Sequence, residues 1–420
     1  MNGLGRAVGD IRLRLYRAVR RRVAGDLIEL AQQSRGRAIP GVRSTRLRIA
    51  AEVVAYFGDV DANLYQLRQW LPALESLHAS HPVVVLTRQA DSYQALSTET
   101  ALPLLLVRDL TALEDVYAAN DFKVVLYVNN GAANFTSLTF TDVLHVHLNH
   151  GESDKVCMAS NQAKAYDRVF VAGDAAVERY RANLINFDGA GLVKIGRPQL
   201  DVTYPAYRPA SQRPTVLYAP TWEGGRPEMD YSSLAVYGEA LVRAVLASEF
   251  RLIYRPHPKT GLGSAEIAEA DRRVRALVAA AAQQAPRTGH VVDTDTPMGG
   301  LFGATNVLVS DVSSVALDFL ATTKPLVVCD IRNDRAALLD ASPVSRVAHV
   351  LDQESLPAAV DDLRRLLRED SGREERVAAI EHYFGDVTPG VATKSFVEAI
   401  AATIAVRDRL VAEKRRRNDQ

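Results

Sequence analysis

The 420-residue chain lacks the signals of several common protein classes. It has two cysteines, Cys157 and Cys329, and no CxxC pair, so we expect neither a disulfide framework nor a cysteine-based metal site. Such sparing use of cysteine is typical of a reducing cytoplasm. No run reaches the roughly 18 apolar residues of a membrane-spanning helix, and the N-terminus has no uninterrupted apolar core of a signal peptide. We therefore expect a protein that is neither secreted nor integral to a membrane.

Charge of one sign is not in excess either. The chain has 50 Lys and Arg residues against 50 Asp and Glu residues, so its composition gives no reason to expect a nucleic-acid partner. Glycine-rich phosphate loops are also missing, because no GxGxxG follows a predicted strand and no GxxxxGK[ST] occurs. A nucleotide would need a different phosphate site in this chain.

From residue 49 onward, short apolar runs alternate with helical stretches such as Leu64–Leu77 and Asp174–Asn183. Strands separated by helical crossovers predict parallel, doubly wound sheets. The runs lie at Ala51–Tyr56, Pro82–Leu86, Pro103–Val107, Val124–Val128, Val143–Leu148, Val169–Ala172, Leu192–Ile195, Thr215–Tyr218, Arg251–Tyr254, His290–Val292, Val307–Val309, Leu326–Cys329 and His349–Leu351. The proline-rich segment Pro198–Pro214 divides them and indicates a linker. The pattern predicts an α/β fold with two Rossmann-like domains and a cleft between them.

A chain of 420 residues with 47% hydrophobic content is long enough for two domains with separate cores. We predict a basic N-terminal segment at 1–46, a first Rossmann-like domain at 47–205 and a second one at 206–386. The remainder, 387–420, is predicted to be a helix, from about 391 to 406, that crosses back over the first domain, followed by a basic tail.

The first 48 residues carry about a dozen arginines against Asp10, Asp26 and Glu29. Apolar residues recur among them at roughly helical spacing, which predicts a basic amphipathic helix. Such a helix can bind an anionic membrane leaflet, and it can equally pack on its own domain or on a second subunit. Both alternatives remain open on the sequence.

Polar residues follow four of the predicted strands, in the segments 149–155, 218–222, 254–259 and 310–314. In an open α/β sheet, ligands bind beyond the carboxyl ends of the strands. Polar groups gathered at these exits therefore predict one shared cleft. We interpret the chain as an enzyme.

Ser310, Asp311, Ser313 and Ser314 stand where a strand is predicted to end and a helix to begin. Helix N-termini bind anions because their unpaired N–H groups and the helix macrodipole act together. This segment therefore predicts a pyrophosphate site. A serine at such a position is also an ordinary N-cap, and that alternative stays open for Ser313 and Ser314.

His257 lies between Pro256 and Pro258 at another strand exit, where the prolines restrict the backbone on both sides. A hydrogen-bonding or cationic histidine beside Arg255 suits a phosphate ligand. The alternative is a structural histidine in a proline turn. Thr221 supplies a hydroxyl at the neighbouring exit.

Three further histidines cluster at 145–150. His145 and His147 share one face of a strand and could ligate zinc, but no carboxylate or cysteine set at ligand spacing accompanies them, so we predict no metal site. His150 lies past the strand and is followed by Gly151, where a general base can reach a substrate hydroxyl. The segment Asp293–Asp295 matches the short metal-binding pattern DxD, which has low specificity, and we interpret it as a helix-capping loop.

Taken in order, these residues carry a resemblance. The set is His150-Gly151 with Lys155, Gly196-Arg197-Pro198 with Asp201, Ala219–Trp222, Arg255–Pro258, and Ser310–Ser314 followed by Asp318-Phe319 and Lys324-Pro325. Over about Leu144 to Asp330, the chain resembles the CDP-glycerol:poly(glycerophosphate) glycerophosphotransferase family of teichoic acid polymerases. The resemblance implies a GT-B-like fold whose first domain binds an acceptor and whose second domain binds a CDP-activated polyol phosphate such as CDP-glycerol. It also implies a cytoplasmic enzyme attached peripherally to the inner face of the plasma membrane.

The resemblance implies roles for single residues as well. His150 matches the catalytic base, and His257, Ser313 and Ser314 match residues that contact the donor pyrophosphate. We then expect His150 to take the proton of an acceptor hydroxyl that attacks the β-phosphorus of the donor, so that CMP leaves. His257, Arg255 and the helix start at Ser313 would stabilise the negative charge on the phosphates. We expect no cofactor.

Lys155, Glu152 and Arg197 are candidates for acceptor binding or support of the site. The family usually has Thr-Pro after His-Gly, whereas this chain has Glu152-Ser153. That departure leaves the acceptor open, and the transferred group can be glycerol phosphate, ribitol phosphate or a sugar phosphate. Two other classes remain open: another GT-B enzyme, either a glycosyltransferase or a nucleotide-sugar 2-epimerase, and a non-catalytic nucleotide-binding protein. No oligomeric state is predicted.

Overall fold

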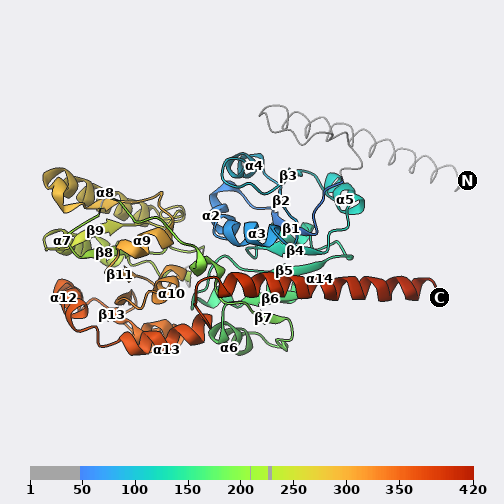
Figure 1. Cartoon of the computed structure of the whole chain (residues 1–420). Coiled ribbons are helices and arrows are strands. Elements are labelled where there is room, and N and C mark those ends of the chain that lie inside the picture. Colours follow the sequence, from blue (N-terminus) through green and yellow to red (C-terminus); the bar gives the residue numbers. More distant parts are fainter. Residues whose placement is uncertain (1–47, 209, 226–228) are drawn as a thin grey trace, which may run out of the picture. The chain divides into compact units, whose positions relative to one another are not determined.

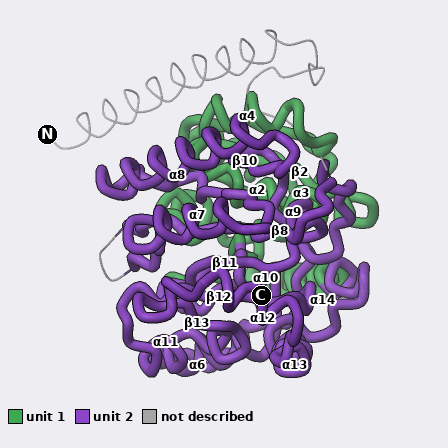
Figure 2. The backbone as a smooth tube through the Cα atoms, turned by 90° about the vertical axis from the view of Figure 1, so that its left-hand side faces the viewer, with its two compact units in different colours: residues 1–150, 162–170, 396–420 green, residues 151–161, 171–395 purple. Residues whose placement is uncertain are grey.

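The computed structural model of the protein describes residues 48–208, 210–225 and 229–420 (Figure 1). The basic segment predicted at 1–46 lies outside the described residues. The described chain forms two compact units, coloured separately in Figure 2. Unit 1 comprises the described residues up to His150 together with Gln162–Phe170 and Phe396–Gln420, and unit 2 comprises Gly151–Asn161 and Val171–Ser395. The predicted domain limits stay a prediction, because a compact unit need not fold independently.

The first sheet has seven strands in the order β3-β2-β1-β4-β5-β6-β7. They are β1 (Val53–Phe57), β2 (Val83–Thr87), β3 (Leu104–Leu106), β4 (Val124–Tyr127), β5 (Leu144–His147), β6 (Arg168–Val171) and β7 (Leu192–Lys194). Neighbouring strands from β3 to β6 pair in parallel. β1, β2 and β4 are buried along their whole length, as strands covered on both faces are.

Short helices connect the strands of unit 1, and a long one ends the chain. They are α2 (Tyr65–Arg68), α3 (Leu71–His78), α4 (Ala90–Leu96), α5 (Leu110–Ala119) and α14 (Val391–Asn418). Phe396 of α14 packs its ring on Trp70, with centroids 5.4 Å apart. Further along α14, the buried guanidinium of Arg407 donates to Asp121 at 2.6 Å. Aromatic packing of Phe396 and a buried arginine near its middle therefore hold α14 in unit 1 from Phe396 onward.

The sequence predicts one helix over Leu64–Leu77, whereas the structure has two, α2 and α3, with a break at Trp70. The Trp70 side chain is buried, and its indole N–H donates to the backbone carbonyl of Asn149 at 2.6 Å. Pro72 lies in the first turn of α3, where a proline is tolerated because its missing N–H has no partner to lose. A distant hydrogen bond and a local proline together end one helix and begin the next.

The second sheet has six strands in the order β10-β9-β8-β11-β12-β13, and all its pairings are parallel. They are β8 (Thr215–Ala219), β9 (Arg251–Tyr254), β10 (Val291–Val292), β11 (Val307–Ser310), β12 (Leu326–Cys329) and β13 (His349–Leu351). The helices of unit 2 are α6 (Asp174–Asn183), α7 (Glu239–Leu246), α8 (Ala265–Gln284), α9 (Met298–Ala304), α10 (Ser314–Leu320), α11 (Arg335–Ala341), α12 (Ala359–Glu369) and α13 (Arg373–Phe384).

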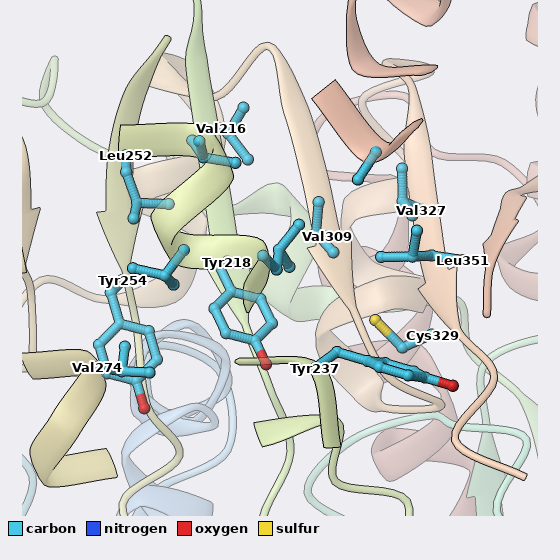
Figure 3. Close-up of a cluster of buried hydrophobic side chains, with 14 of the residues drawn as sticks. Val216, Tyr218, Tyr237, Leu252, Tyr254, Val274, Val309, Val327, Cys329 and Leu351 are labelled. Carbon is cyan, nitrogen blue, oxygen red and sulfur yellow. The ribbon is translucent and has the colours of Figure 1, made fainter. Parts of the chain in front are cut away.

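Alternate residues of the second sheet enter two different cores. Val216 and Tyr218 of β8 join a cluster with residues of α7, α8 and α12, which Figure 3 shows. Leu217 and Ala219 join a cluster with residues of α9, α10 and α13. Because side chains alternate along a strand, both faces of the sheet are covered. The polar side chains of this sheet are therefore left at the ends of its strands.

The predicted α/β class with two parallel, Rossmann-like sheets is confirmed. Each predicted apolar run overlaps one of the strands β1–β13, and both sheets are doubly wound. In the part of the chain that the structure describes, no helix is both long and apolar enough to cross a bilayer.

Candidate functional site

His150 follows β5 as the last residue of this part of unit 1. Asn149 before it has a φ of 58°, a left-handed conformation that asparagine tolerates better than most residues. The Asn149 side-chain oxygen accepts the backbone N–H of His150 at 2.9 Å. The imidazole meets the ring of Tyr65 edge-on, with centroids 6.0 Å apart. The turn after β5 thus fixes the imidazole beyond the strand.

The two histidines on β5 itself have packing roles. His145 contacts the hydroxyl of Tyr127 and the carbonyl of Phe140, both at 2.9 Å. His147 stacks on Tyr166, and burial, with a smaller effect of His150, lowers the pKa of His147 to about 3. Among the described residues, no three His, Cys, Asp or Glu side chains gather as metal ligands.

Gly151 is the first residue of unit 2 after His150. A Cβ atom at this position would lie 2.9 Å from the Cβ of Ser314, the first residue of α10. Real Cβ atoms do not approach so closely, so the backbone meets the start of α10 at a distance that only glycine allows.

Glu152 and Asp154 form a buried ionic network. Arg179 of α6 donates to Glu152 at 3.1 Å and to Asp154 at 3.3 Å. The other oxygen of Asp154 accepts the Tyr383 hydroxyl at 2.8 Å and the Val344 N–H at 3.0 Å. Glu152 was predicted as support for the acceptor or the site, and its carboxylate is occupied by this internal network. This network ties the segment that follows His150 to α6 and to Val344.

Arg197, the third candidate for site support, is buried and pairs with Asp318 of α10. Its Nε and Nη2 atoms donate to the two carboxylate oxygens of Asp318 at 2.9 Å and 3.0 Å. This two-point contact fixes the orientation of α10, because a planar guanidinium and a carboxylate align both partners. Arg197 thus holds the helix that begins at Ser314.

Lys155, Thr221 and Asp311 form a chain of hydrogen bonds at the carboxyl edge of the second sheet. Lys155 Nζ donates to Thr221 Oγ1 at 2.9 Å. The backbone N–H groups of Thr221 and Ser233 donate to the two oxygens of Asp311 at 2.7 Å and 3.2 Å. Burial raises the pKa of Asp311 to about 6, against the opposing effect of these hydrogen bonds and of Lys155. Asp311 was predicted to bind the donor, and it organises the backbone around Thr221.

The serines at the start of α10 have internal partners. Ser310 Oγ donates to the carbonyl of Ala219 at 2.7 Å and lies 3.1 Å from Ser313 Oγ. Ser313 Oγ accepts the N–H of Ala316 at 3.2 Å, so Ser313 is the N-cap of α10. The N-cap alternative is therefore realised for Ser313. Its contact with a donor, and that of Ser314, stay predictions.

His257 lies after β9 and is fixed on two sides. Its Nδ1 accepts the backbone N–H of Lys259 at 3.1 Å, which leaves the proton of the neutral ring on Nε2. The imidazole is nearly parallel to Trp222, with centroids 6.1 Å apart, and Lys259 Nζ lies 4.9 Å from the Trp222 ring centre. The predicted clamping by the prolines is thus supplemented by stacking.

Glu223 holds the loop that follows His257. Its carboxylate is buried and accepts the N–H groups of Gly261, Gly263 and Ser264 at 3.0, 2.7 and 3.1 Å. Glu223 was not predicted from the sequence. The one feature of the sequence that could have indicated Glu223 is its position directly after Pro220-Thr221-Trp222 at a strand exit. The neighbouring residues give no indication that its partners lie about forty residues away.

Arg255 was predicted to face phosphate, and its guanidinium is paired internally. It donates to Asp293 at 2.9 Å, and Asp293 also accepts the Tyr207 hydroxyl and both donors of Thr296. Asp293 does not cap α9, whose N-cap is Pro297, so the interpretation of Asp293–Asp295 as a helix-capping loop is wrong. The aspartate is instead the counter-ion of Arg255.

Unit 2 therefore brings most of the predicted residues to one edge. β9, β8 and β11 are neighbours, and their exits carry His257, Thr221 and Ser310–Ser314. Lys155 reaches this edge through Thr221, and Gly151 reaches it through Ser314. Ammonium, imidazole, hydroxyl and amide donors on one edge suit an anionic ligand with several oxygen atoms.

Comparison with protein families gives one match of long extent. A profile of the family described as CDP-Glycerol:Poly(glycerophosphate) glycerophosphotransferase matches residues 106–401, a span that contains every predicted site residue. A comparison with curated protein sequences gives no significant match.

Solved structures resemble most of the chain. A structure described as a UDP-N-acetylglucosamine 2-epimerase from Listeria monocytogenes has a TM-score of 0.56 at 14% identity, covering 84% of this chain and 96% of its own. The wall teichoic acid polymerase TagF, as a histidine variant soaked with CDPG, has a TM-score of 0.53 at 14% identity, covering 84% and 88%. MnaA of S. aureus with UDP has a TM-score of 0.52 at 11% identity, covering 84% and 97%. These likenesses show the fold and confirm the GT-B-like class.

Proposed function

Because the chain belongs to the CDP-glycerol:poly(glycerophosphate) glycerophosphotransferase family, we propose that it transfers glycerol phosphate, or a related polyol phosphate, from a CDP-activated donor to a hydroxyl acceptor. The observation that carries the proposal is the family match over 106–401 together with the donor-rich edge of unit 2. The acceptor is a cell-surface polymer or a lipid-linked precursor of one. CMP is the second product.

In the proposed reaction, the acceptor oxygen forms a bond to the β-phosphorus of the donor. The bond from that phosphorus to the bridging oxygen breaks, and CMP leaves with the oxygen. His150 takes the acceptor proton, a role that suits a histidine fixed beyond its strand by Asn149 and Tyr65. Because the reacting group carries several negative charges, most of the catalysis comes from positioning and from electrostatic stabilisation.

His257 is proposed to donate a hydrogen bond to the donor phosphates through Nε2. The contact of its Nδ1 with the Lys259 N–H supports this role, because it leaves Nε2 as the protonated nitrogen. Thr221, Ser313 and Ser314 are proposed to add hydroxyl or amide donors around the same phosphates. Arg255 would act at longer range, since Asp293 already binds its guanidinium.

We further propose that the enzyme is cytoplasmic and binds peripherally to the inner face of the plasma membrane. Support comes from the basic residues of the segment 1–46, whose charge suits an anionic leaflet. A lipid-linked or wall-bound acceptor would also require an enzyme that reaches the membrane surface.

One experiment tests the proposed reaction directly. The purified protein is incubated with CDP-glycerol, CDP-ribitol or UDP-N-acetylglucosamine and a polyol-phosphate acceptor, and the products are analysed by mass spectrometry. The proposal predicts free CMP and an acceptor that is heavier by one polyol phosphate. Release of UDP, or epimerisation of the UDP-sugar, would instead assign the protein to another GT-B activity. Binding of CDP-glycerol without turnover would indicate a non-catalytic protein.

A further inference from the structure

The side chain of Lys155 is partly buried and has few partners. An ammonium group carries three N–H donors, and one of them is used by Thr221 Oγ1 at 2.9 Å. Within the described ranges of the chain, no carboxylate lies within salt-bridge distance of Lys155 Nζ. Burial lowers the pKa of Lys155, and the more distant groups of Cys157, Asp311 and Asp230 act in the opposite direction. The fold thus holds a partly desolvated ammonium group, and only one of its three N–H groups donates to an acceptor in the described part of the chain.

Lys324 shows what this fold does with a structural lysine. Burial also lowers the pKa of Lys324, but its Nζ donates to three backbone carbonyls, those of Phe302, Gly303 and Thr305, at 2.8, 3.3 and 2.7 Å. All its donors are therefore satisfied inside the protein. A buried polar group normally finds such partners because leaving them out costs stability. Lys155, which is also only partly buried, differs from Lys324 because Thr221 accepts one of its three N–H groups. Its other donors can bind an external ligand.

A second cation gathers at the same place. Lys155 Nζ lies 5.3 Å from the ring centre of Tyr231, and the guanidinium carbon of Arg332 lies 5.6 Å from it. Both cations therefore lie beside one ring, at distances typical of cation–π contacts. An anion near Tyr231 would be attracted by both positive charges.

The neighbouring aspartate does not fill this role. Both oxygens of Asp311 accept backbone N–H groups, those of Thr221 and Ser233. Asp311 therefore fixes Thr221, and Thr221 in turn fixes Lys155 through its hydroxyl. The arrangement orients the ammonium without neutralising it by direct contact.

From these contacts we propose that Lys155 is the principal cationic ligand of the donor diphosphate and that Arg332 assists it across Tyr231. This inference rests on the proposed function and deepens it. It assigns the binding of the negatively charged diphosphate to Lys155 and not to Arg255, whose guanidinium is neutralised by Asp293. The ligand class is a nucleoside diphosphate or its polyol ester.

Calorimetric titration of the full-length protein tests the assignment with two probes, CDP and inorganic pyrophosphate. Lys155→Met removes the charge, and Lys155→Gln keeps a donor for Thr221 and serves if the methionine variant does not fold. Loss of one charge-assisted contact predicts an affinity for both probes that is about ten- to a hundredfold lower. Arg332→Gln, at an exposed residue, should lower the affinity by a smaller factor.

Lys324→Met is the matched control, because it also removes a partly buried lysine ammonium. It should lower the unfolding temperature and leave the affinity for CDP unchanged. Equal losses of affinity in the two lysine variants would overturn the proposal, as would unchanged affinity in both Lys155 variants. A wild-type protein that binds neither CDP nor pyrophosphate would also overturn it.

The test separates this inference from the proposed reaction. If the wild-type protein binds CDP through Lys155 but turns over no CDP-activated polyol, the diphosphate site stands and the proposed function fails. Titration with glycerol 3-phosphate distinguishes the acceptor from the donor. An affinity loss for glycerol 3-phosphate with unchanged CDP affinity would assign the ammonium to an acceptor phosphate and overturn the donor assignment.

Discussion

Gly151 lies against Ser314 so closely that a Cβ atom on the glycine would be 2.9 Å from the Cβ of the serine. Gly151 follows His150 in the chain, and Ser314 begins α10. The contact therefore joins the segment after the proposed base to the helix whose start carries the proposed donor contacts. Gly151 does not have the left-handed φ that would by itself favour glycine. The close approach to Ser314 is therefore the physical reason for a glycine at this position.

The first prediction concerns this contact. Gly151→Ala should destabilise the protein by about 1–3 kcal/mol, because the added methyl group overpacks a well-filled contact. Ser314→Gly removes the opposing atoms, so the double variant should recover part of the loss. Urea unfolding of the two single variants and the double variant measures the coupling. Strictly additive losses would mean that the two residues do not clash.

The second prediction concerns Arg179. Arg179→Met leaves Glu152 and Asp154 buried without their cation, and breaking such a network costs about 3–5 kcal/mol. The matched control is Arg68→Met, which breaks the exposed pair with Glu99 and should cost less than about 1 kcal/mol. Denaturant unfolding compares the two. Similar, small losses would show that the carboxylates reach solvent when the arginine is removed.

The third prediction separates the two proposed site histidines. His150→Ala should lower turnover about a hundredfold or more and leave CDP affinity nearly unchanged, because a general base acts on the acceptor proton. His257→Ala should instead weaken CDP binding. Steady-state kinetics and calorimetry on the same preparations give both quantities. Near-normal turnover of the His150 variant would contradict its role as base.

The fourth prediction uses the raised pKa of Asp311. With a folded pKa of about 6 against the ordinary 3.8, the folded state holds a proton that the unfolded state releases between these values. Stability conferred by Asp311 should therefore be greatest near pH 4 and fall as the pH rises to about 6, by roughly 1.4 kcal/mol per pH unit. Above pH 6 it should be constant.

Asp311→Asn tests this slope because it cannot titrate. The variant also loses one acceptor for the Thr221 and Ser233 amides, so it should be less stable overall. The difference in unfolding free energy between wild type and variant should shrink from pH 4 to pH 6. A difference that grows with pH over this range would mean that Asp311 is charged and stabilising in the folded protein.

The strands and their exits could be predicted from the sequence because both signals are local. A strand of a parallel sheet covered on both faces is a continuous apolar run, and the polar residues after it mark the edge where ligands bind. For the same reason His257 and Thr221 could be placed at strand exits from the sequence. The two prolines and the apolar strands beside them are visible in the sequence.

The charge pairing of the site could not be predicted, because its partners are far apart in the chain. Arg197 meets Asp318 across 121 residues, and Arg255 meets Asp293 across 38. The local periodicity of a sequence carries no information about contacts between residues so far apart in the chain. Arg255 was predicted to bind the donor and Glu152 to bind the acceptor or support the site, and the fold gives both an internal partner. Lys155 is the reverse case. It was predicted as a candidate for acceptor binding or site support, and its hydrogen bond to Thr221, with no ion pair among the described residues, became visible only with the fold.

The last prediction concerns the membrane. The segment 1–46 carries arginines between apolar residues at helical spacing, and each basic residue near an anionic leaflet contributes about 1 kcal/mol. The full chain should therefore sediment with vesicles containing anionic lipid, and less so as salt is added, because exposed charges are screened over about 8–10 Å at physiological ionic strength. Removing residues 1–46 should abolish sedimentation and spare transfer to a small soluble acceptor. A truncated protein that aggregates or loses its thermal transition would place the segment in the core or in a subunit interface, and equal sedimentation with and without it would refute its role as the anchor.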